Sequence, residues 1–314
     1  MPAGTLILST VALILAIAAP QSQAPATQSH APATTNWMEW QVRLARAGFS
    51  PGEIDGRDGA NTQRAIAAFA QARQLSPRDL DAIGSALNSD AVEMLTTYTI
   101  TAEDASTPLL PSIPEDLMAQ AQLPGLYYTS LLEMIAERAH TAPALLKRLN
   151  PGKSFAPGEE IKVPNVQRAA TAATATATGA RVVVSRSRSG LTVYDASNAV
   201  IFFAPVTSGS EHDPLPVGKW LVTAVVRNPT FNYNPALFWD AEPGHAKAKL
   251  PAGPNGPVGT VWIDITRTHY GIHGTSEPGQ VGHVTSHGCV RLTNWDAETV
   301  ASFVKKGTVV IFEP

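Results

Sequence analysis

Cysteine is almost absent from this sequence, because Cys289 is the only one in 314 residues. One cysteine cannot form a disulfide within its own chain, so no internal disulfide holds the fold. Cys289 is preceded by His287 and Gly288 and is followed two positions later by Arg291. This polar, glycine-flanked setting favours a nucleophile over the alternative of an inert buried thiol.

Basic residues are not in excess either. The chain has 23 Lys and Arg against 26 Asp and Glu, which gives a formal net charge of -3. Nucleic-acid binding proteins carry a basic surface, so this composition gives no support to a nucleic-acid partner.

Long apolar runs are missing except near the start. An apolar stretch within residues 1–19, followed by small and polar residues, predicts a secretory signal peptide over residues 1–26. No Lys or Arg precedes this stretch, so an uncleaved anchor is the alternative, although the run is shorter than the roughly 20 residues of a spanning helix. We therefore expect an exported protein of the periplasm or cell envelope, with no stable membrane span after cleavage. An unpaired thiol in that oxidising environment needs a functional reason.

Two segments of low complexity divide the rest of the chain. Residues 27–36 are rich in Pro, Ala, Thr and Ser, and residues 166–180 are mostly Ala and Thr, so both are predicted to be flexible linkers. Between and after them we expect a helical module over residues 37–100, a spacer over 101–165 and an independent domain over 181–314.

The helical module begins with apolar residues at helical spacing from Trp37, and a second helix is expected over residues 61–74. A turn rich in glycine and proline joins the two helices. This order of parts resembles the small helical peptidoglycan-binding module of many cell-wall enzymes, in these residues: Gly48-Phe49, Pro51-Gly52, Ile54-Asp55-Gly56, Thr62, Ala65 and Phe69. The resemblance implies affinity for peptidoglycan, and the alternative is a helical hairpin that only packs on the rest of the chain.

The spacer ends in a stretch that is similar to a LysM unit. A helical run from Leu131 is followed by elements that match the pattern, namely Leu146 to Asn150 and then Gly158 to Pro164. The similarity implies binding to glycan strands rich in N-acetylglucosamine. The opening strand of such a unit is not obvious in the sequence, so a spacer with a chance resemblance is the alternative.

Residues 181–314 have the pattern of a mainly β domain. Runs rich in β-branched and aromatic residues predict strands at 182–184, 191–194, 200–203, 220–226, 261–265 and 308–312. One helix is expected after a capping arrangement at Thr293 to Asp296, with apolar residues at helical spacing up to Val304 and Gly307 ending the run.

Four histidines precede Cys289, so a metal site has to be considered: His269, His273, His283 and His287. His269 and His273 belong to a predicted strand, where residues four apart lie about 13 Å from each other, too far to share one ion. No helical histidine pair of the zinc-protease type occurs in the sequence. We therefore expect neither a metal ion nor another cofactor.

The thiol instead needs a base, because a free cysteine is mostly protonated at neutral pH. His273 ends the predicted strand and is followed by Gly274, which allows a turn that aims the imidazole at Cys289. His287 is the competing base. Residues two apart on an extended segment point to opposite faces, which favours His273.

The other residues around the cysteine have predicted roles as well. The backbone amides of His287, Gly288 and Cys289 are expected to converge on an oxyanion, and Gly288 allows the unusual dihedral angles that this requires. Arg291 lies two residues after Cys289, so along an extended segment both side chains would lie on the same face. Arg291 is therefore a candidate for binding a substrate carboxylate, with a structural ion pair as the alternative. Ser286 either contacts substrate or completes the turn.

Two short segments together carry a close family resemblance. Ile272-His273-Gly274, followed by Ser286-His287-Gly288-Cys289-Val290-Arg291-Leu292, matches the signature of L,D-transpeptidases of the YkuD type. The resemblance covers residues 181–314 and includes Asp213 to Trp220, which is similar to a family segment before a core strand. It implies a mainly β sandwich or barrel with one or two helices.

The resemblance also implies a mechanism. Cys289 would attack the carbonyl of the diaminopimelate residue at position three of a donor stem tetrapeptide, release D-Ala and form a thioester. Transfer to the side-chain amine of another stem would give a 3-3 cross-link, and transfer to a lysine of an envelope protein would anchor that protein to the wall. The alternatives are an L,D-carboxypeptidase or cross-link hydrolase with the same cysteine, and a non-catalytic peptidoglycan-binding protein. Carbapenems are the expected inhibitors.

A long segment between Arg227 and Val261 interrupts the strand pattern. It is rich in turn residues and aromatics, and loops of this length are often functional. We expect it to be a lid or groove wall over Cys289, or else a packed surface excursion. Trp239 within it and Tyr270 after it are candidates for substrate binding.

Overall fold

The computed structural model describes residues 35–88, 92–167 and 179–314. The expected signal peptide, most of the first linker and most of the second linker lie outside the described residues. Among the helices that the structure does describe, none combines the length and the apolar character that a bilayer crossing requires.

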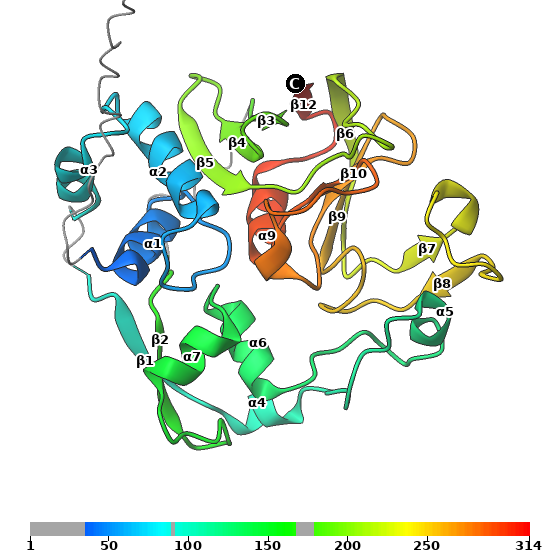
Figure 1. The fold of residues 1–314 in the computed structure, drawn as a ribbon, viewed down its shortest axis with the longest axis horizontal. Coiled ribbons are helices and arrows are strands. Elements are labelled where there is room, and N and C mark those ends of the chain that lie inside the picture. The colour runs from blue at the N-terminus through cyan, green and yellow to red at the C-terminus, as the bar shows by residue number, and fades with distance from the viewer. Residues whose placement is uncertain (1–34, 89–91, 168–178) are drawn as a thin grey trace, which may run out of the picture.

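A curled eight-stranded sheet forms the centre of residues 181–314 (Figure 1). Its order is β11-β10-β9-β6-β12-β3-β4-β5, and all neighbours are antiparallel except β10 with β11 and β12 with β3. The predicted mainly β class is confirmed. The strands are β3 (Arg181–Ser185), β4 (Gly190–Tyr194), β5 (Val200–Pro205), β6 (Gly218–Arg227), β9 (Val261–Ile265), β10 (Gly271–His273), β11 (Val290–Arg291) and β12 (Val309–Glu313).

The two edges of this sheet meet. Thr207, just after β5, donates its backbone N–H to the Arg291 carbonyl of β11 at 3.1 Å, and Arg291 donates back to the Thr207 carbonyl at 2.8 Å. This single bridge joins the first and last strands of the sheet, which gives the fold its barrel-like curl. Arg291 is therefore fixed at the seam.

One helix, α9 (Asn294–Phe303), packs against β9 and β10. Thr293 caps it by accepting a hydrogen bond from the Asp296 amide, as the sequence predicts. Ala297 and Val300 of α9 are fully buried in the core with the inward residues of the strands. The helix thus stabilises the back of the two strands that flank the candidate site.

The helical module consists of α1 (Trp37–Arg46), α2 (Ala60–Ala72) and α3 (Leu80–Leu87) around one small core. Its glycine-rich turn faces the sheet. Phe49 is buried and pairs through its backbone with Phe203 of β5, and Ser50 Oγ donates to the Asp296 carboxylate at 2.9 Å. The motif that resembles a peptidoglycan-binding turn is therefore occupied, in part, by contacts within the chain.

The spacer forms a unit of two strands and two helices together with β1 (Leu95–Thr99), a strand that lies just before residue 101 and so within the range predicted for the helical module. β1 pairs antiparallel with β2 (Glu160–Pro164), and α6 (Leu131–Arg138) and α7 (Pro143–Leu149) pack on them through a shared core. The opening strand that the sequence does not reveal is β1. Its relation to LysM units stays a prediction.

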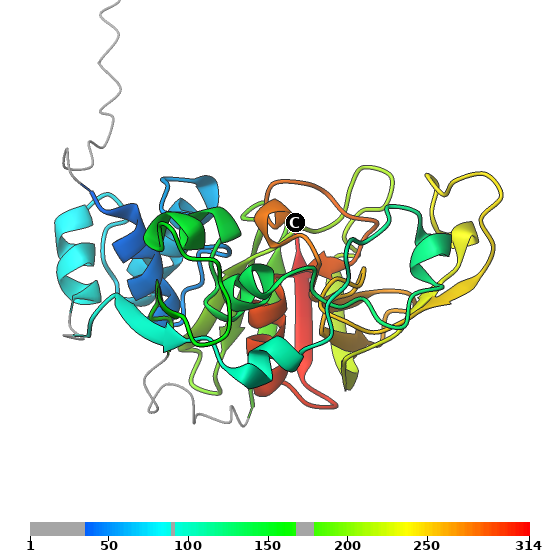
Figure 2. The ribbon, with the colours of Figure 1, turned by 90° about the horizontal axis from the view of Figure 1, so that it is seen from below.

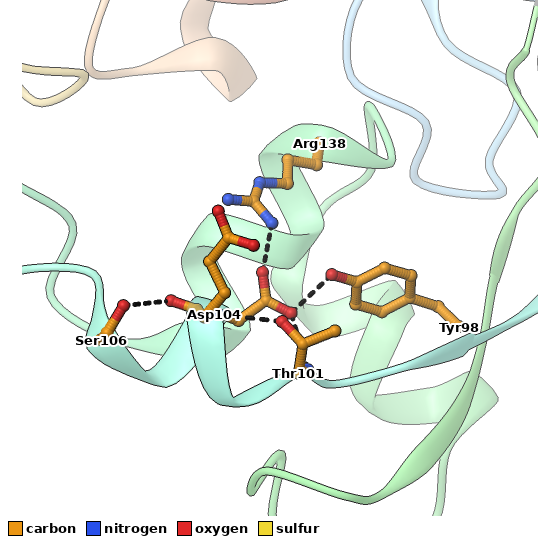
Figure 3. Close-up of polar contacts among 6 residues, drawn as sticks. Tyr98, Thr101, Asp104, Ser106 and Arg138 are labelled. Atoms are coloured by element: carbon orange, nitrogen blue, oxygen red, sulfur yellow. Dashed lines mark hydrogen bonds and ion pairs between the residues drawn. The ribbon is translucent and has the colours of Figure 1, made fainter.

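A polar cluster holds the start of this unit together (Figure 3). Asp104 of α4 (Ala102–Ser106) is 4% exposed and accepts hydrogen bonds from Tyr98 and from Arg138 of α6, both at 2.5 Å. Thr101 and Asp104 also form a reciprocal capping box. Burial alone would raise the pKa of Asp104, but these hydrogen bonds outweigh it and hold that pKa below its usual range.

The long connection after α4 leads away from this unit. It carries α5 (Leu117–Gln120), which packs on the insertion with β7 (Phe231–Tyr233) and β8 (Ala248–Leu250). The helical module and the insertion lie at opposite ends of the central sheet (Figure 1 and Figure 2).

Candidate active site

Cys289 lies on a bend directly before β11 and opens into a large cleft of about 1160 Å³. Five of the predicted site residues line this cleft: Cys289, His273, His287, Arg291 and Tyr270. The fold therefore brings together residues that lie up to 21 positions apart in the sequence. Ser286, Gly274, Gly288 and Trp239 do not line it but lie next to residues that do.

The thiol of Cys289 contacts the backbone of the turn that precedes β10. Its Sγ lies 3.7 Å from the carbonyl oxygen of His269, to which it donates. Burial raises the pKa of the thiol, while the Gly271 backbone and the charge of Arg291 oppose that rise. The resting form is thus a neutral thiol that needs a base to react.

His273 is a buried and uncharged imidazole. It ends β10 and is 4% exposed, and its Nδ1 lies 2.7 Å from the Gly274 carbonyl oxygen. A carbonyl only accepts hydrogen bonds, so Nδ1 carries the proton and Nε2 keeps its lone pair. Burial, followed by the charge of Arg291, lowers the pKa of His273 to about 3. Within the described residues no hydrogen bond joins His273 to Cys289.

A neighbouring strand orients this imidazole. Trp262 of β9 stacks on the His273 ring with centroids 5.3 Å apart and planes 19° from parallel. The Trp262 indole N–H donates to Asp264 at 3.3 Å, and Asp264 also accepts from Thr223 of β6. This support was not predicted from the sequence, because the register that places Trp262 opposite His273 is seen only when β9 and β10 pair.

Gly274 is required by close packing. A Cβ atom there would lie 2.1 Å from Asn294 Oδ1. Asn294 begins α9, and its amide donates to both oxygens of Glu137 in α6, at 3.1 and 3.2 Å. Burial raises the pKa of Glu137 to about 7. The turn after His273 is therefore braced by the spacer.

Gly288 supplies the backbone geometry of the cysteine turn. Its φ is +99°, a conformation that L side chains rarely adopt, and a Cβ there would lie 2.5 Å from the Tyr270 ring. Ser286 Oγ donates to the Cys289 carbonyl at 2.6 Å, which closes the same turn. Both observations match the predicted demands of a tight turn.

His287 differs from the expectation that it points away from the thiol. The chain bends at Gly288 instead of running extended, so His287 and Cys289 line the same cleft. His287 Nε2 lies 2.8 Å from Asp240 Oδ1, and the centroid of its ring lies 5.1 Å from that of the Phe238 ring. The insertion thus holds the His287 ring through Asp240 and Phe238. This contact, and not the alternation of side chains along a strand, distinguishes the environment of His287 from that of His273.

Arg291 lines the cleft and has a side-chain donor that is unpaired in the described part of the chain. Its Nε is buried and has no hydrogen-bond partner among the described residues, and no ion pair links its side chain to a residue of that part of the chain. Leaving such a donor unpaired is costly unless a ligand satisfies it. This unpaired side chain favours a role for Arg291 in binding an anionic ligand over the alternative role, in which Arg291 forms an ion pair within the protein.

The insertion forms one wall of the cleft. Phe238 and Asp240 line it, whereas Trp239 between them is 63% exposed and stacks on His212 at 4.6 Å. The spacer contributes to the same wall, a contact between distant segments that local sequence patterns do not predict. Residues 115–117 line the cleft, and Leu126 shares a core with Tyr233 and Leu250 of the insertion.

The helical module supports the loop that leads to Cys289. Asn61 of α2 donates to the Val281 carbonyl at 2.8 Å, and Arg64 donates to the Gly282 carbonyl at 3.1 Å. Removing both side chains leaves that end of the loop held by Thr207, whose hydroxyl accepts a hydrogen bond from the Gly282 amide at 2.9 Å.

We expect the double variant Asn61→Ala/Arg64→Ala to lower the acylation rate of Cys289 by about 2- to 30-fold, the range that couplings of 0.5–2 kcal/mol produce. Hydrogen exchange of residues 281–288 should rise in parallel. Gln63→Ala is the matched control, because that side chain is exposed and contacts Asp58 instead of the loop. Equal rates in the double variant and the control would contradict a supporting role of the module.

Family models match two parts of the chain. Residues 179–312 match the L,D-transpeptidase catalytic domain of the YkuD type, and residues 34–77 match the model described as "Putative peptidoglycan binding domain".

Relatives of known sequence share the first of these names. The chain is 28% identical over 186 residues to "Putative L,D-transpeptidase YkuD" of Bacillus licheniformis, a match that covers 58% of this chain and 93% of that protein. It is 30% identical over 135 residues to "Probable L,D-transpeptidase YbiS" of Escherichia coli K12, covering 42% of this chain and 44% of the relative. The chain therefore spans less than half of the latter protein's length.

Solved structures are more distant. An L,D-transpeptidase from Mycobacterium smegmatis matches with a TM-score of 0.36 and 19% identity, over 43% of this chain and 59% of that chain. L,D-transpeptidase 3 from Mycobacterium tuberculosis, in complex with a faropenem-derived adduct, matches with a TM-score of 0.34 and 21% identity, over 43% and 60%. From the family models, residues 179–312 form an L,D-transpeptidase catalytic domain of the YkuD type, and residues 34–77 form a peptidoglycan-binding-type module in front of it.

Proposed function

We propose that the protein joins peptidoglycan stem peptides through a thioester on Cys289. The observation that carries this proposal is the composition of one cleft, in which a thiol, a buried neutral imidazole and an unpaired guanidinium lie together. A nucleophile, a base and an anion-binding group are the parts that acyl transfer from a peptide needs.

In the first half-reaction, Cys289 Sγ attacks the carbonyl carbon of diaminopimelate at position three of the donor tetrapeptide. His273 accepts the thiol proton at Nε2, and the amides of Gly288 and Cys289, with that of His287, stabilise the oxyanion. The carbon–nitrogen bond to D-Ala then breaks, and His273 returns the proton to the leaving amine. The product is a thioester and free D-Ala.

In the second half-reaction, an amine takes the acyl group. The ammonium group of the acceptor first releases one proton to solvent. Its neutral nitrogen then attacks the thioester carbonyl and gives a second proton to His273, which passes it to the departing thiolate, so that a neutral amide and a free thiol remain. An amine acceptor arrives as a cation, and six carboxylates line the cleft against the two arginines Arg267 and Arg291: Glu115, Asp116, Asp213, Asp240, Glu242 and Asp264. This acidic lining favours a diaminopimelate amine as acceptor, which yields a 3-3 cross-link.

Arg291 has a separate task in this proposal. Its guanidinium, which lines the cleft and has no ion-pair partner among the described residues, would bind a carboxylate of the donor stem and align the scissile carbonyl with Cys289. Ser286 supports the turn, and Tyr270 packs on Gly288, so both act through the position of the thiol. Trp239 lies outside the cleft lining, where it is available to a longer glycan-bearing substrate.

The parts before the catalytic domain fit the same substrate. We propose that residues 37–100 and the unit at 101–165 give affinity for peptidoglycan and its glycan strands, and that residues 1–26 direct export to the periplasm or cell envelope. The linkers 27–36 and 166–180 would bound these parts. Carbapenems are expected to acylate Cys289, because their strained carbonyl occupies the place of the donor carbonyl.

The proposal is tested by incubating the protein and its Cys289→Ala variant with disaccharide-tetrapeptide and following the products by mass spectrometry. Cross-linked dimers that need Cys289 support transfer. Tripeptide alone would make the protein an L,D-carboxypeptidase or hydrolase. Absence of any cysteine-dependent product would favour a non-catalytic wall-binding protein.

The pH profile of acylation follows from the two pKa shifts. The pKa of His273 is lowered to about 3 and that of Cys289 is raised. At pH values between these two pKa values, the imidazole and the thiol are therefore both neutral. The rate of carbapenem acylation should therefore stay flat from about pH 5 to pH 8 and fall only in stronger acid, where His273 becomes protonated.

Two other profiles would contradict this account. An acid limb centred near the ordinary histidine pKa of 6.5 would mean that His273 titrates normally. A rise of about tenfold per pH unit across the neutral range would mean that a preformed thiolate reacts without a base.

A further inference from the structure

A second cluster of polar side chains lies in the wall of the cleft, where the spacer meets the insertion. Asp116 precedes α5, whereas Glu242 and His245 lie in the insertion between Trp239 and β8. One ligand atom from each of the three lies within 4.8 Å of the other two. Asp116 and Glu242 belong to the acidic lining of the cleft, and none of the three residues touches the reacting atoms in the mechanism proposed above.

His245 is the least exposed member of this cluster, and one of its ring nitrogens has no hydrogen-bond partner among the described residues. Its side chain is 10% exposed, and its Nδ1 lies 3.0 Å from the hydroxyl of buried Tyr233. Its Nε2 is buried without a hydrogen-bond partner among the described residues, and it lies 3.7 Å from an Asp116 oxygen and 3.6 Å from a Glu242 oxygen. Both separations exceed the length of a hydrogen bond, so the nitrogen faces the two carboxylates at ion-pair distance without a hydrogen bond to either.

The size of the cluster distinguishes between two cationic occupants. Ligands about 2.0–2.2 Å from a tetrahedral zinc ion lie about 3.3–3.6 Å from one another. Acceptors that share an ammonium group through hydrogen bonds of about 2.8 Å lie about 4.6 Å apart. The separations of 3.6 and 3.7 Å from His245 Nε2 fit the metal ion.

The surroundings agree with this assignment. A Tyr233 hydroxyl that accepts the Nδ1 proton leaves the Nε2 lone pair for a metal, which is the usual outer support of a ligating histidine. Asp116 Oδ1 accepts the amides of Met118 and Ala119, so backbone contacts orient its carboxylate. Imidazole with carboxylates suits zinc and its neighbours better than magnesium or calcium.

We propose that Asp116, Glu242 and His245 bind a divalent transition-metal ion of the zinc type. The ion would join the spacer to the insertion at the edge of the cleft. This joint adjoins the segment whose Asp240 contacts His287, so the ion would stiffen the wall beside Cys289 without entering the reaction.

The test is a calorimetric titration of the chelator-treated full chain with zinc chloride, carried out in a Cys289→Ala background so that the thiol cannot bind the metal. One ion per chain and a rise in the unfolding temperature are expected. His245→Ala should abolish both, and Asp116→Asn, which keeps the cap of α5, should weaken binding. Tyr233→Phe should weaken it by about 10- to 100-fold.

The matched control is His212→Ala, which removes an exposed histidine outside the cluster. Circular dichroism checks that each variant folds. Zinc binding that survives His245→Ala, or no zinc binding by the parent chain, would overturn the proposal. A His245→Ala variant that changes only the KM for a diaminopimelate acceptor would assign the cluster to an ammonium group instead.

Discussion

His273→Ala is expected to lower the second-order rate of carbapenem acylation at Cys289 by about 10²- to 10⁴-fold, the contribution that a positioned general base makes. The reason lies in the resting state of the pair. The pKa of the thiol is raised and that of His273 is lowered to about 3, so acylation depends on proton transfer to the free Nε2 during the attack. Intact-mass kinetics of the acyl-enzyme measure the rate.

A buried imidazole also packs, so the variant needs a control for shape. His273→Gln fills much of the same space against Trp262 but does not accept a proton at neutral pH. We expect it to be nearly as slow as His273→Ala. Recovery of activity in His273→Gln would show that packing matters and would remove His273 from the role of base. His287→Ala should cost far less, because Asp240 engages that ring.

Gly288→Ala should have the second largest effect, with a loss of acylation of about 10²- to 10³-fold, as for removal of an oxyanion donor. Its φ of +99° strains any L side chain, and the added Cβ would lie 2.5 Å from the Tyr270 ring. The strain itself costs about 1–3 kcal/mol. The turn can relieve it only by moving the amides of Gly288 and Cys289.

Two variants separate the causes. Gly59→Ala is a matched control, because no atom lies within 4 Å of the added Cβ, and it should leave the rate unchanged. The double variant Gly288→Ala/Tyr270→Ala removes the steric contact but keeps the backbone strain, so its rate should stay low. A wild-type rate in Gly288→Ala would contradict the proposed oxyanion site.

Much of the catalytic domain was predictable from local signals. Runs of Val and Ile predicted the core strands, because β-branched residues pack well on a pleated sheet that is buried. The cap at Thr293 and the spacing of Ala297 and Val300 predicted α9. The constellation of Cys289 and His273 was recognisable because glycines mark the turns beside both residues.

Other features depend on contacts that local patterns do not contain. β1 has only half-buried and exposed residues and little apolar signal, so it is fixed by its pairing with β2. The strand-alternation argument for His287 failed because Gly288 turns the chain. The contributions of Asp240 and Glu137 come from segments far from Cys289 in sequence, and only the packed fold brings them close.

The helical module contacts the catalytic domain directly, whereas the sequence predicted two separately folded parts. Phe49 and Ser50 of its glycine-rich turn contact β5 and α9, and Asn61 and Arg64 hold the loop before Cys289. A hydrophobic turn motif has the same sequence whether it binds a ligand or a neighbouring domain. The structure adds the second use without excluding the first.

The central claim is that a thioester forms on Cys289, and acid-quenched mass spectrometry tests it most directly. The full chain is mixed with disaccharide-tetrapeptide, stopped in acid and digested to locate any bound acyl group. We predict a disaccharide-tripeptide adduct on Cys289, release of D-Ala, and neither event in Cys289→Ala. Release of D-Ala by the Cys289→Ala variant, or an acyl group on another residue, would contradict the account.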